Sequence, residues 1–331
     1  MQIGVIGINH KLADLKLRET LAKVCERRFH PRFSAHREQA FVLLSTCNRT
    51  EIYFSSKDLA ESHSYLLSIL RQEIEEEFDQ KLYSYFRLEC FYHLTRVTTG
   101  LDSACIAETE IQGQVKAAYE MAQKALCLTP DLHFLFQKAL HIGKQIRSEL
   151  NLGRGLPELE DAIVDTASHF FCDLNHIKIL FVGASHINEK ILSCKKLPHI
   201  HLMTRSQDRA RELKGRLNLE TVTWNLAAWV DYDWILFGTK ASDYLIEPTN
   251  LSSRKLVMDL SVPRNVNPSL AKDPLVTLLN IDQLNRLLHT RHKQLHSSLA
   301  HADSLVTTLA ERHHTLFQQK RSCPLPLALS A

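Results

Sequence analysis

The sequence lacks several features that would each define a class of protein. No apolar run reaches the roughly 20 residues of a membrane span, and the N-terminus MQIGVIGINHK has no basic leader. No two of the eight cysteines stand at CxxC spacing, which argues against a zinc knuckle and a dithiol redox pair. The net charge is only +3, so the chain is not built to coat nucleic acid along its whole surface. We therefore expect a cytoplasmic protein with reduced thiols and no metal site.

The length and composition are those of an ordinary globular protein with more than one domain. Of 331 residues, 44% are hydrophobic and 23% are charged, enough for two or three well-formed cores. Residues 1–155 are predicted to form an α+β domain, because strands come first and helices follow without strict alternation. The segment 153–157 combines glycine and proline breakers and is the expected boundary. Strands are predicted at 2–8, 40–44 and 51–54, and helices at 15–28, 60–77, from 88 onward, at 111–125 and at 132–150.

Residues 156–282 show a different pattern, in which short apolar runs alternate with helical stretches. Strands separated by crossover helices predict a parallel, doubly wound α/β sheet of the Rossmann type. From residue 283 to residue 331, leucines at three-, four- and seven-residue steps predict one long C-terminal helix followed by a short Pro-broken tail. A helix that projects past the last strand needs a partner. The expected strands are 178–182, 201–203, 221–223, 234–237 and 256–260.

A glycine turn follows the first strand of this second domain. It occupies the place where a dinucleotide-binding fold keeps GxGxxG and holds pyrophosphate at a helix N-terminus. Only the first glycine of that pattern is present, so a tight turn of an ordinary α/β domain is the alternative. The residues concerned are Gly183, Ala184, Ser185, His186, Ile187 and Asn188.

The end of the next strand bears on the choice of cofactor. About 20 residues after the glycine turn, an NAD enzyme has an acidic residue for the ribose hydroxyls. This chain has Arg205 between Thr204 and Ser206 instead, a set suited to a 2′-phosphate. The pattern favours NADPH over NADH. An exposed arginine at a strand end is the alternative.

One cysteine has the neighbours of a reactive group. The run LLSTCNRTEIY places Cys47 after a buried strand and before a polar turn, so its sulfur can reach a cleft while the backbone stays rigid. Arg49 can stabilise the thiolate, and Thr46 and Asn48 can supply hydrogen bonds. A cysteine nucleophile beside a nicotinamide domain predicts reduction of an activated acyl group through an enzyme thioester, because thioesters react readily with hydride. A buried structural thiol is the alternative for Cys47.

Several segments carry a resemblance to a known family. STCNRTEIY at 45–53 is nearly identical to the nucleophile motif of glutamyl-tRNA reductases, and GINHK followed by LRETLA within 7–22 matches that family's opening. HLTRVTTGLDS at 93–103 and GQVKAAYE at 113–120 match its second signature. SVPRNVNP at 261–268 resembles the segment that closes its nucleotide domain.

The resemblance implies a reaction. Members of the family reduce the aminoacyl ester of glutamyl-tRNA(Glu) with NADPH to glutamate-1-semialdehyde and release the tRNA, the first step of five-carbon tetrapyrrole synthesis. By matching positions, Cys47 would be the nucleophile and Arg49 would bind the side-chain carboxylate of the substrate. His93 would handle the proton of the departing ribose oxygen. The other pocket residues that the match implies are Thr46, Asn48, Ser103, Glu108, Thr109, Glu110 and Gln114.

The match also assigns domains and partners. Residues 1–155 would be the catalytic, tRNA-binding domain and residues 156–282 the NADPH domain. Glu108-Thr109-Glu110 stands where the family usually has Glu-Pro-Gln, and the family's GAG turn is GAS here. The family continues into a helical dimerisation domain that this chain lacks, which leaves homodimer formation open. Glutamate-1-semialdehyde aminomutase, which would receive the aldehyde, is a further partner that the family suggests.

Two other functions stay open at this point. The altered Glu110 and the missing domain are compatible with a weakly active or inactive relative that binds tRNA or haem as a regulator. A small-molecule dehydrogenase in which Cys47 is incidental is the third hypothesis. No pattern defines a tRNA surface, and a basic stretch near the domain boundary is our working hypothesis for it. That stretch contains Lys138, Lys144, Arg147 and Arg154.

Overall fold

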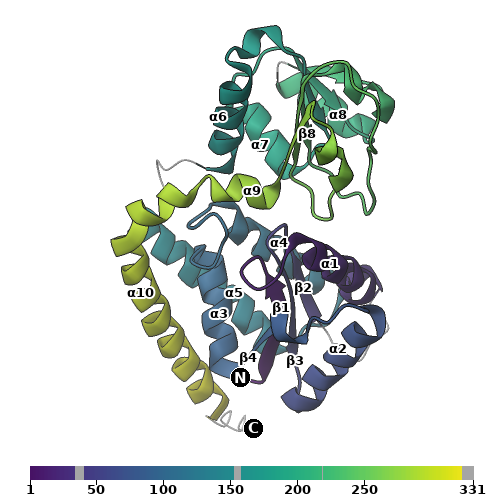
Figure 1. The fold of residues 1–331 in the computed structure, drawn as a ribbon. Coiled ribbons are helices and arrows are strands. Elements are labelled where there is room, and N and C mark those ends of the chain that lie inside the picture. The colour runs from purple at the N-terminus through teal and green to yellow at the C-terminus, as the bar shows by residue number, and fades with distance from the viewer. Residues whose placement is uncertain (34–40, 153–157, 218, 323–331) are drawn as a thin grey trace. The chain divides into compact units, whose positions relative to one another are not determined.

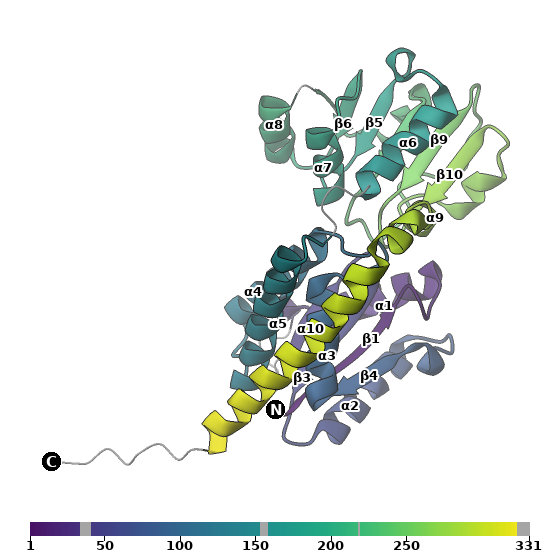
Figure 2. The same cartoon turned by 90° about the vertical axis from the view of Figure 1, so that its left-hand side faces the viewer.

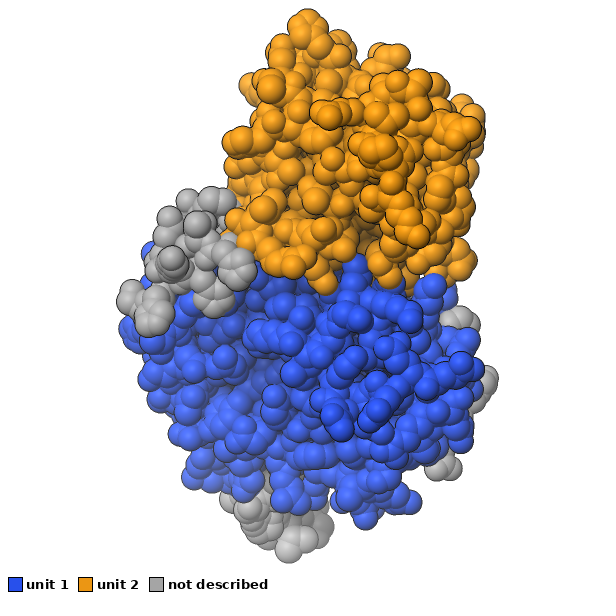
Figure 3. All heavy atoms as spheres, viewed as in Figure 1, with its two compact units in different colours: residues 1–155, 292–331 blue, residues 156–291 orange. Residues whose placement is uncertain are grey.

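The chain forms two compact units. The computed structural model describes residues 1–33, 41–152, 158–217 and 219–322. Residues 1–155 together with residues 292–331 make up unit 1, and residues 156–291 make up unit 2 (Figure 3). The predicted boundary segment 153–157 lies outside the described residues. None of the helices in the described ranges has the length and apolar character that crossing a lipid bilayer requires.

Unit 1 is built on an antiparallel sheet with strand order β2-β3-β1-β4. One sheet face packs against α1 and α2 through apolar side chains such as Ile8, Leu43 and Ile52. The short strand β4 was not predicted, because its side chains are only partly buried and show no apolar run. The strands are β1 (Ile3–Asn9), β2 (Phe41–Ser45), β3 (Arg49–Ser55) and β4 (Tyr83–Phe86).

The helices of unit 1 begin and end at recognisable caps. The Asp14 carboxylate accepts from the Leu17 N–H at the start of α1, and Thr129 caps α5 in the same way. Gly100 ends α3 in the left-handed region, with φ of 83°. The helices are α1 (Leu15–Phe29), α2 (Leu59–Glu73), α3 (Arg87–Thr99), α4 (Glu110–Ala125) and α5 (Pro130–Glu149).

The predicted C-terminal helix is two helices, α9 (Ile281–Arg286) and α10 (His289–Ser322). The prediction of one continuous helix from residue 283 is wrong at residues 287–288. There the backbone N–H groups of Leu287 and Leu288 bond to carbonyls three residues back, which ends the α-helical pattern.

The partner of α10 is unit 1 of the same chain. The helix runs alongside α3 and α5 in both ribbon views (Figures 1 and 2). Phe317 packs on Phe134 of α5, with the two rings tilted and their centroids 4.2 Å apart. On α3, Tyr92 donates to Glu311 at 2.9 Å and Arg96 pairs with Asp303. Among the described residues of α10, the most deeply buried are Ala302, Val306 and Ala310, at 0–2% exposure, whereas Leu316 of the predicted leucine pattern is 44% exposed.

Unit 2 contains a six-stranded sheet of order β10-β9-β8-β5-β6-β7, in which every pair is parallel. The predicted Rossmann-type sheet is confirmed, and β10, which was not predicted, extends it. The strand order reverses between β5 and β8, where open α/β sheets bind ligands at the carboxyl ends of their strands. The helices are α6 (Leu159–Phe171), α7 (His186–Cys194) and α8 (Gln207–Arg216). The strands are β5 (Ile179–Val182), β6 (Ile200–Met203), β7 (Glu220–Val222), β8 (Trp234–Phe237), β9 (Lys255–Asp259) and β10 (Val276–Asn280).

The close crossing of α3 and α5 depends on Gly143. A Cβ there would lie 2.7 Å from Oγ1 of Thr98, whose hydroxyl already donates to the Ala139 carbonyl at 2.8 Å. We expect Gly143→Ala to lower the free energy of unfolding by about 1–3 kcal/mol through overpacking. The matched change Gly113→Ala meets no atom within 4 Å on α4, so it should stabilise by up to about 1 kcal/mol. Urea unfolding measures the free energy of unfolding of both variants. Equal changes in the two would contradict the dependence of the α3–α5 crossing on Gly143.

Candidate active site

Cys47 lies in a tight turn between β2 and β3 that the backbone holds in place. The Thr46 N–H donates to the Arg49 carbonyl at 2.8 Å, and the Thr46 hydroxyl accepts from the Arg49 N–H at 3.2 Å. Arg18, a buried side chain of α1, donates to the Cys47 carbonyl. The Cys47 side chain itself is half-buried. The sulfur is therefore carried on a rigid turn and is not sealed in packed hydrocarbon.

The surroundings of this turn are cationic. The backbone N–H of His10 donates to the Asn48 carbonyl at 2.9 Å, so residue 10 lies beside the turn. Burial, followed by the charges of Lys11, Arg49 and Arg18, lowers the pKa of His10 to about 4. His10 is therefore neutral at physiological pH, and the positive field that suppresses its protonation favours a negatively charged ligand or thiolate nearby.

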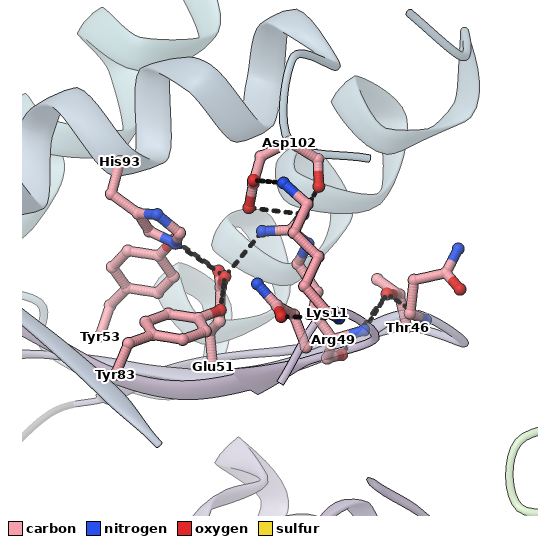
Figure 4. Close-up of polar contacts among 10 residues, drawn as sticks. Lys11, Thr46, Arg49, Glu51, Tyr53, Tyr83, His93 and Asp102 are labelled. Atoms are coloured by element: carbon pink, nitrogen blue, oxygen red, sulfur yellow. Dashed lines mark hydrogen bonds and ion pairs between the residues drawn. The ribbon is translucent and has the colours of Figure 1, made fainter. Parts of the chain in front are cut away.

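A buried ion-pair cluster begins two residues after Cys47. Alternation along β3 turns Arg49, Glu51 and Tyr53 to the same face. Nη1 of Arg49 donates to Oε1 of Glu51 at 2.9 Å, and the two side chains are 1% and 0% exposed. The hydroxyl of Tyr53 donates to Oε2 of Glu51 at 2.6 Å, the hydroxyl of Tyr83 donates to Oε1 at 2.5 Å, and Nε2 of His93 lies 2.8 Å from Oε1 (Figure 4).

Glycine in β1 leaves room for this cluster. A Cβ on Gly7, which pairs with Glu51 in the sheet, would lie 2.8 Å from Cγ of Glu51 and 3.0 Å from the Tyr83 hydroxyl. Burial raises the pKa of Glu51, but the charges of His93 and Arg49 and the hydrogen bonds outweigh it, and the pKa falls well below its usual range. Glu51 is therefore ionised, and its partners compensate a charge that has lost its water.

Asp102 connects the cluster to the exterior. Nη2 of Arg49 donates to the Asp102 carbonyl at 2.5 Å and to its Oδ2 at 3.2 Å, while Lys11 pairs with Oδ1 (Figure 4). The loop that carries Asp102 is anchored by Arg147, which donates to the carbonyls of Ala107 and Glu108 at 3.3 and 2.6 Å. Arg147 thus anchors this loop of unit 1, and its contact with tRNA stays a hypothesis.

The remaining members of that hypothesis have different positions. Lys144 is exposed and Lys138 is half-buried on α5, whereas Arg154 lies outside the described residues.

The predicted substrate residues only partly gather around this cluster. Thr46, Asn48, Arg49 and His93 lie on the turn, β3 and α3 as described, and Ser103 is buried next to Asp102. Glu108 lies in the same loop, where burial raises its pKa to about 6. Thr109 is exposed and Glu110 begins α4, and Gln114 is exposed on that helix. Glu51, Asp102, Tyr83 and Lys11 were not predicted, although the charged pair at positions 49 and 51 of a buried strand was a signal for Glu51.

The glycine turn of unit 2 has the geometry of a dinucleotide site at its first residue. Gly183 has φ of 91°, and a Cβ there would lie 2.3 Å from the Gly238 carbonyl. The Ser185 hydroxyl caps α7 by accepting from the Asn188 N–H at 3.3 Å. Asn188 stands at the position of the third glycine of GxGxxG. It is fully buried and donates to the Gly183 carbonyl at 2.9 Å. Ala184, His186 and Ile187 complete the turn and the first turn of α7.

Arg205 is exposed at the end of β6, with its guanidinium carbon 4.9 Å from the centroid of the Trp224 ring. Thr204 precedes it, and the Ser206 hydroxyl caps α8 by accepting from the Arg209 N–H at 3.3 Å. Together with the left-handed Gly183 and the N-terminus of α7, these residues fit a dinucleotide.

The loops after β8 and β9 form a rigid border beside this site. Asp259, which is 1% exposed, accepts from the N–H groups of Ser261, Asn265 and Val266 at 3.1, 2.8 and 2.9 Å. The Thr239 hydroxyl donates to Asn265 at 2.6 Å. Loops at these strand ends can contact the nicotinamide half of a dinucleotide.

The fold and these two sets of residues define a class of oxidoreductase, in which a cysteine-bearing α+β unit accompanies a dinucleotide-type unit. Known proteins agree with that class. Residues 6–150 match the family model of the glutamyl-tRNA(Glu) reductase N-terminal domain, and residues 165–287 match that of shikimate/quinate 5-dehydrogenase. The second match supports a nicotinamide cofactor.

Similar proteins identify the family. A glutamyl-tRNA reductase from Akkermansia muciniphila is 31% identical and aligns with 95% of this chain and 97% of its own length. One from Alcanivorax borkumensis is 29% identical over 95% of this chain and 79% of its own length. The solved glutamyl-tRNA reductase of Methanopyrus kandleri has the same fold, with a TM-score of 0.51 at 22% identity over 97% of this chain and 81% of that one. The chain belongs to the glutamyl-tRNA reductase family.

Replacing the central carboxylate should unfold the cluster. Glu51→Gln removes the negative charge and leaves Arg49 buried with part of its charge uncompensated, so we expect a loss of about 3–5 kcal/mol in the free energy of unfolding. The control Glu77→Gln changes an exposed glutamate of the same unit and should stay within about 0.5 kcal/mol. Chemical denaturation measures both, and similar small effects would show that the ion pair contributes little.

Proposed function

We propose that the protein reduces glutamyl-tRNA(Glu) with NADPH to glutamate-1-semialdehyde, through a thioester on Cys47, and releases the tRNA. The observation that carries this proposal is the half-buried Cys47 on its rigid turn, two residues from the buried Arg49. Membership of the glutamyl-tRNA reductase family supports the same substrate. A small-molecule dehydrogenase would have no need of this turn.

The first half of the reaction is an acyl transfer. The Cys47 thiolate attacks the ester carbonyl, a C–S bond forms, the C–O bond to the tRNA ribose breaks, and the departing oxygen takes up a proton. His93 is the proposed carrier of that proton. Its ring stacks on Tyr85 with centroids 4.9 Å apart, and its Nε2 lies 2.8 Å from Glu51. A carboxylate in that position orients the imidazole and stabilises the cation that proton transfer creates.

The second half reduces the thioester. When bound, NADPH supplies the hydride for the acyl carbon, after which the C–S bond breaks, the aldehyde leaves and Cys47 returns as a thiolate. Gly183 and the N-terminus of α7 would hold the pyrophosphate, and Arg205 would hold the 2′-phosphate.

The proposed substrate residues support the acyl group. Arg49 would supply the positive charge for the glutamyl carboxylate. The other members of this set are Thr46, Asn48, Ser103, Glu108, Thr109, Glu110 and Gln114. Glutamate-1-semialdehyde aminomutase is the proposed acceptor of the aldehyde, since a free aldehyde next to an amine is reactive.

Intact-mass measurement tests the thioester. Without NADPH, glutamyl-tRNA should add a glutamyl group to the protein, and NADPH should discharge it as the semialdehyde. Cys47→Ala should form no adduct and lose roughly a thousandfold or more in reduction rate, because the nucleophile is gone. Cys127→Ala, which removes an exposed cysteine, is the control and should behave as the parent. Tight tRNA binding by the parent with no adduct would favour a regulatory binder instead.

Arg205 provides the test of cofactor choice. Arg205→Gln removes a charge-assisted hydrogen bond to the 2′-phosphate, so KM for NADPH should rise roughly 10- to 100-fold. KM for NADH should change little, and adduct formation without cofactor should be unaffected. Arg211→Gln, which removes an arginine paired with Asp208 on the exposed surface of α8, is the control. A parallel rise in both KM values would contradict a 2′-phosphate contact.

A further inference from the structure

A glutamyl ester brings two charges to its pocket, and the described residues around Cys47 account for only one of them so far. The group carries a γ-carboxylate, for which Arg49 is proposed, and an α-ammonium, for which no partner has been assigned. An ammonium that leaves water for a partly buried pocket needs an anionic acceptor. The search for that acceptor rests on the proposed function of the same site.

Glu51 cannot serve as the acceptor. Its two oxygens already have Arg49, His93 and the hydroxyls of Tyr53 and Tyr83 within 2.5 to 2.9 Å, and its side chain is 0% exposed. A carboxylate has about four lone-pair positions. Since three of these donors are on Oε1, one is on Oε2 and the side chain is fully buried, a substrate cannot reach Glu51.

Asp102 has the opposite character. Its side chain is 13% exposed, and the partner on its Oδ1 is the ammonium of Lys11, a side chain that is 50% exposed. Burial alone raises the pKa of Asp102, but Arg49 and Lys11 outweigh it, so the pKa lies below its usual value and the group is ionised. The main-chain carbonyl of Asp102 stays bonded to Arg49 at 2.5 Å whatever occupies Oδ1. The carboxylate is therefore charged, accessible and held in place.

Lys11 is a replaceable partner. Its ammonium is the same chemical group as the substrate's α-ammonium, so an exchange of one for the other keeps the ion pair on Asp102. Lys11 can return to water, because its side chain is flexible and half exposed. Four of the charged groups here, Arg49, Lys11, Glu51 and Asp102, balance to zero, and the glutamyl group is itself zwitterionic. The exchange therefore keeps one cation on Asp102, and the groups left in the pocket then sum to −1 because Lys11 has returned to water.

We infer that Asp102 is the acceptor for the α-ammonium of the glutamyl group, which displaces Lys11 as it binds. Figure 4 shows Lys11 and Arg49 on the same carboxylate, next to the turn that carries Thr46. Asp102 is thus a specificity-determining residue. It favours an aminoacyl-tRNA with a free α-amino group over one whose amino group is acylated, because the acylated form has no ammonium to take the place of Lys11 on Asp102.

The test compares glutamyl-tRNA with N-acetylglutamyl-tRNA as acyl donors to the full-length protein. Adduct formation on Cys47 is followed without NADPH, and the ratio of the two second-order rates is the readout. We expect the parent to prefer glutamyl-tRNA by at least about 100-fold. In Asp102→Asn the ratio should fall below about 5, through a loss on glutamyl-tRNA and little change on the acetylated donor. Asp79→Asn, which breaks an exposed pair with Arg71, should keep the parental ratio.

Lys11→Gln provides a second variant that leaves Asp102 in place. It removes the competing ammonium, so the preference for glutamyl-tRNA should stay the same or rise. Both donors carry the same tRNA. A weaker general attraction for tRNA therefore lowers both rates equally and cancels in their ratio.

Each outcome decides the inference. Equal losses on both donors in Asp102→Asn, or a preference that narrows in Lys11→Gln, would overturn the role of Asp102. No adduct with either donor on the parent protein would instead overturn the proposed function. If Asp102→Asn fails to melt cooperatively, the ratio for Lys11→Gln decides.

Discussion

The Arg49–Glu51 ion pair is the interaction on which unit 1 depends. Two opposite charges at 1% and 0% exposure are costly to bury, and they are tolerated because two tyrosines, a histidine and Asp102 complete the hydrogen bonds. The pair fixes β3 against α3 and the loop at residues 100–109. Since Cys47 lies two residues before Arg49, the position of the sulfur is set by the same contacts.

Around this rigid centre, the charges differ in how firmly they are held. Glu51 is surrounded by donors, whereas Lys11 and Asp102 form a pair at the edge with one flexible member. Such a gradient suits a pocket for a small zwitterion, because the inner charges keep the geometry and the outer ones can exchange partners. The pKa of His10 beside the turn is lowered first by burial and then by the charges of Lys11, Arg49 and Arg18, so His10 is neutral.

In unit 2, uncharged groups and not ion pairs shape the glycine turn. Its turn needs a left-handed residue at position 183, and the tight contact with the Gly238 carbonyl allows only glycine there. The two other positions of the glycine pattern carry Ser185 and Asn188, whose side chains bond to the turn itself. Ser185 and Asn188 take up space that glycine would leave open. Their hydrogen bonds thus compensate for the departure from the glycine motif. The packing of α10 on α3 and α5 likewise uses side chains such as Phe317 and Glu311, whose partners the sequence did not identify.

The sequence alone determined the parallel sheet, most helices and the cysteine turn, because these depend on local periodicity and on neighbours along the chain. It also contained the motifs in which Cys47, Arg49 and His93 match residues of the glutamyl-tRNA reductase family. Only the tertiary structure decided that Arg49 meets both Glu51 and Asp102 while Lys11 pairs with Asp102, that Arg147 anchors a loop, and that α10 returns to unit 1. Those contacts join residues up to about 200 positions apart, such as Arg96 and Asp303, and pairing at that range follows from packing, which no local pattern encodes.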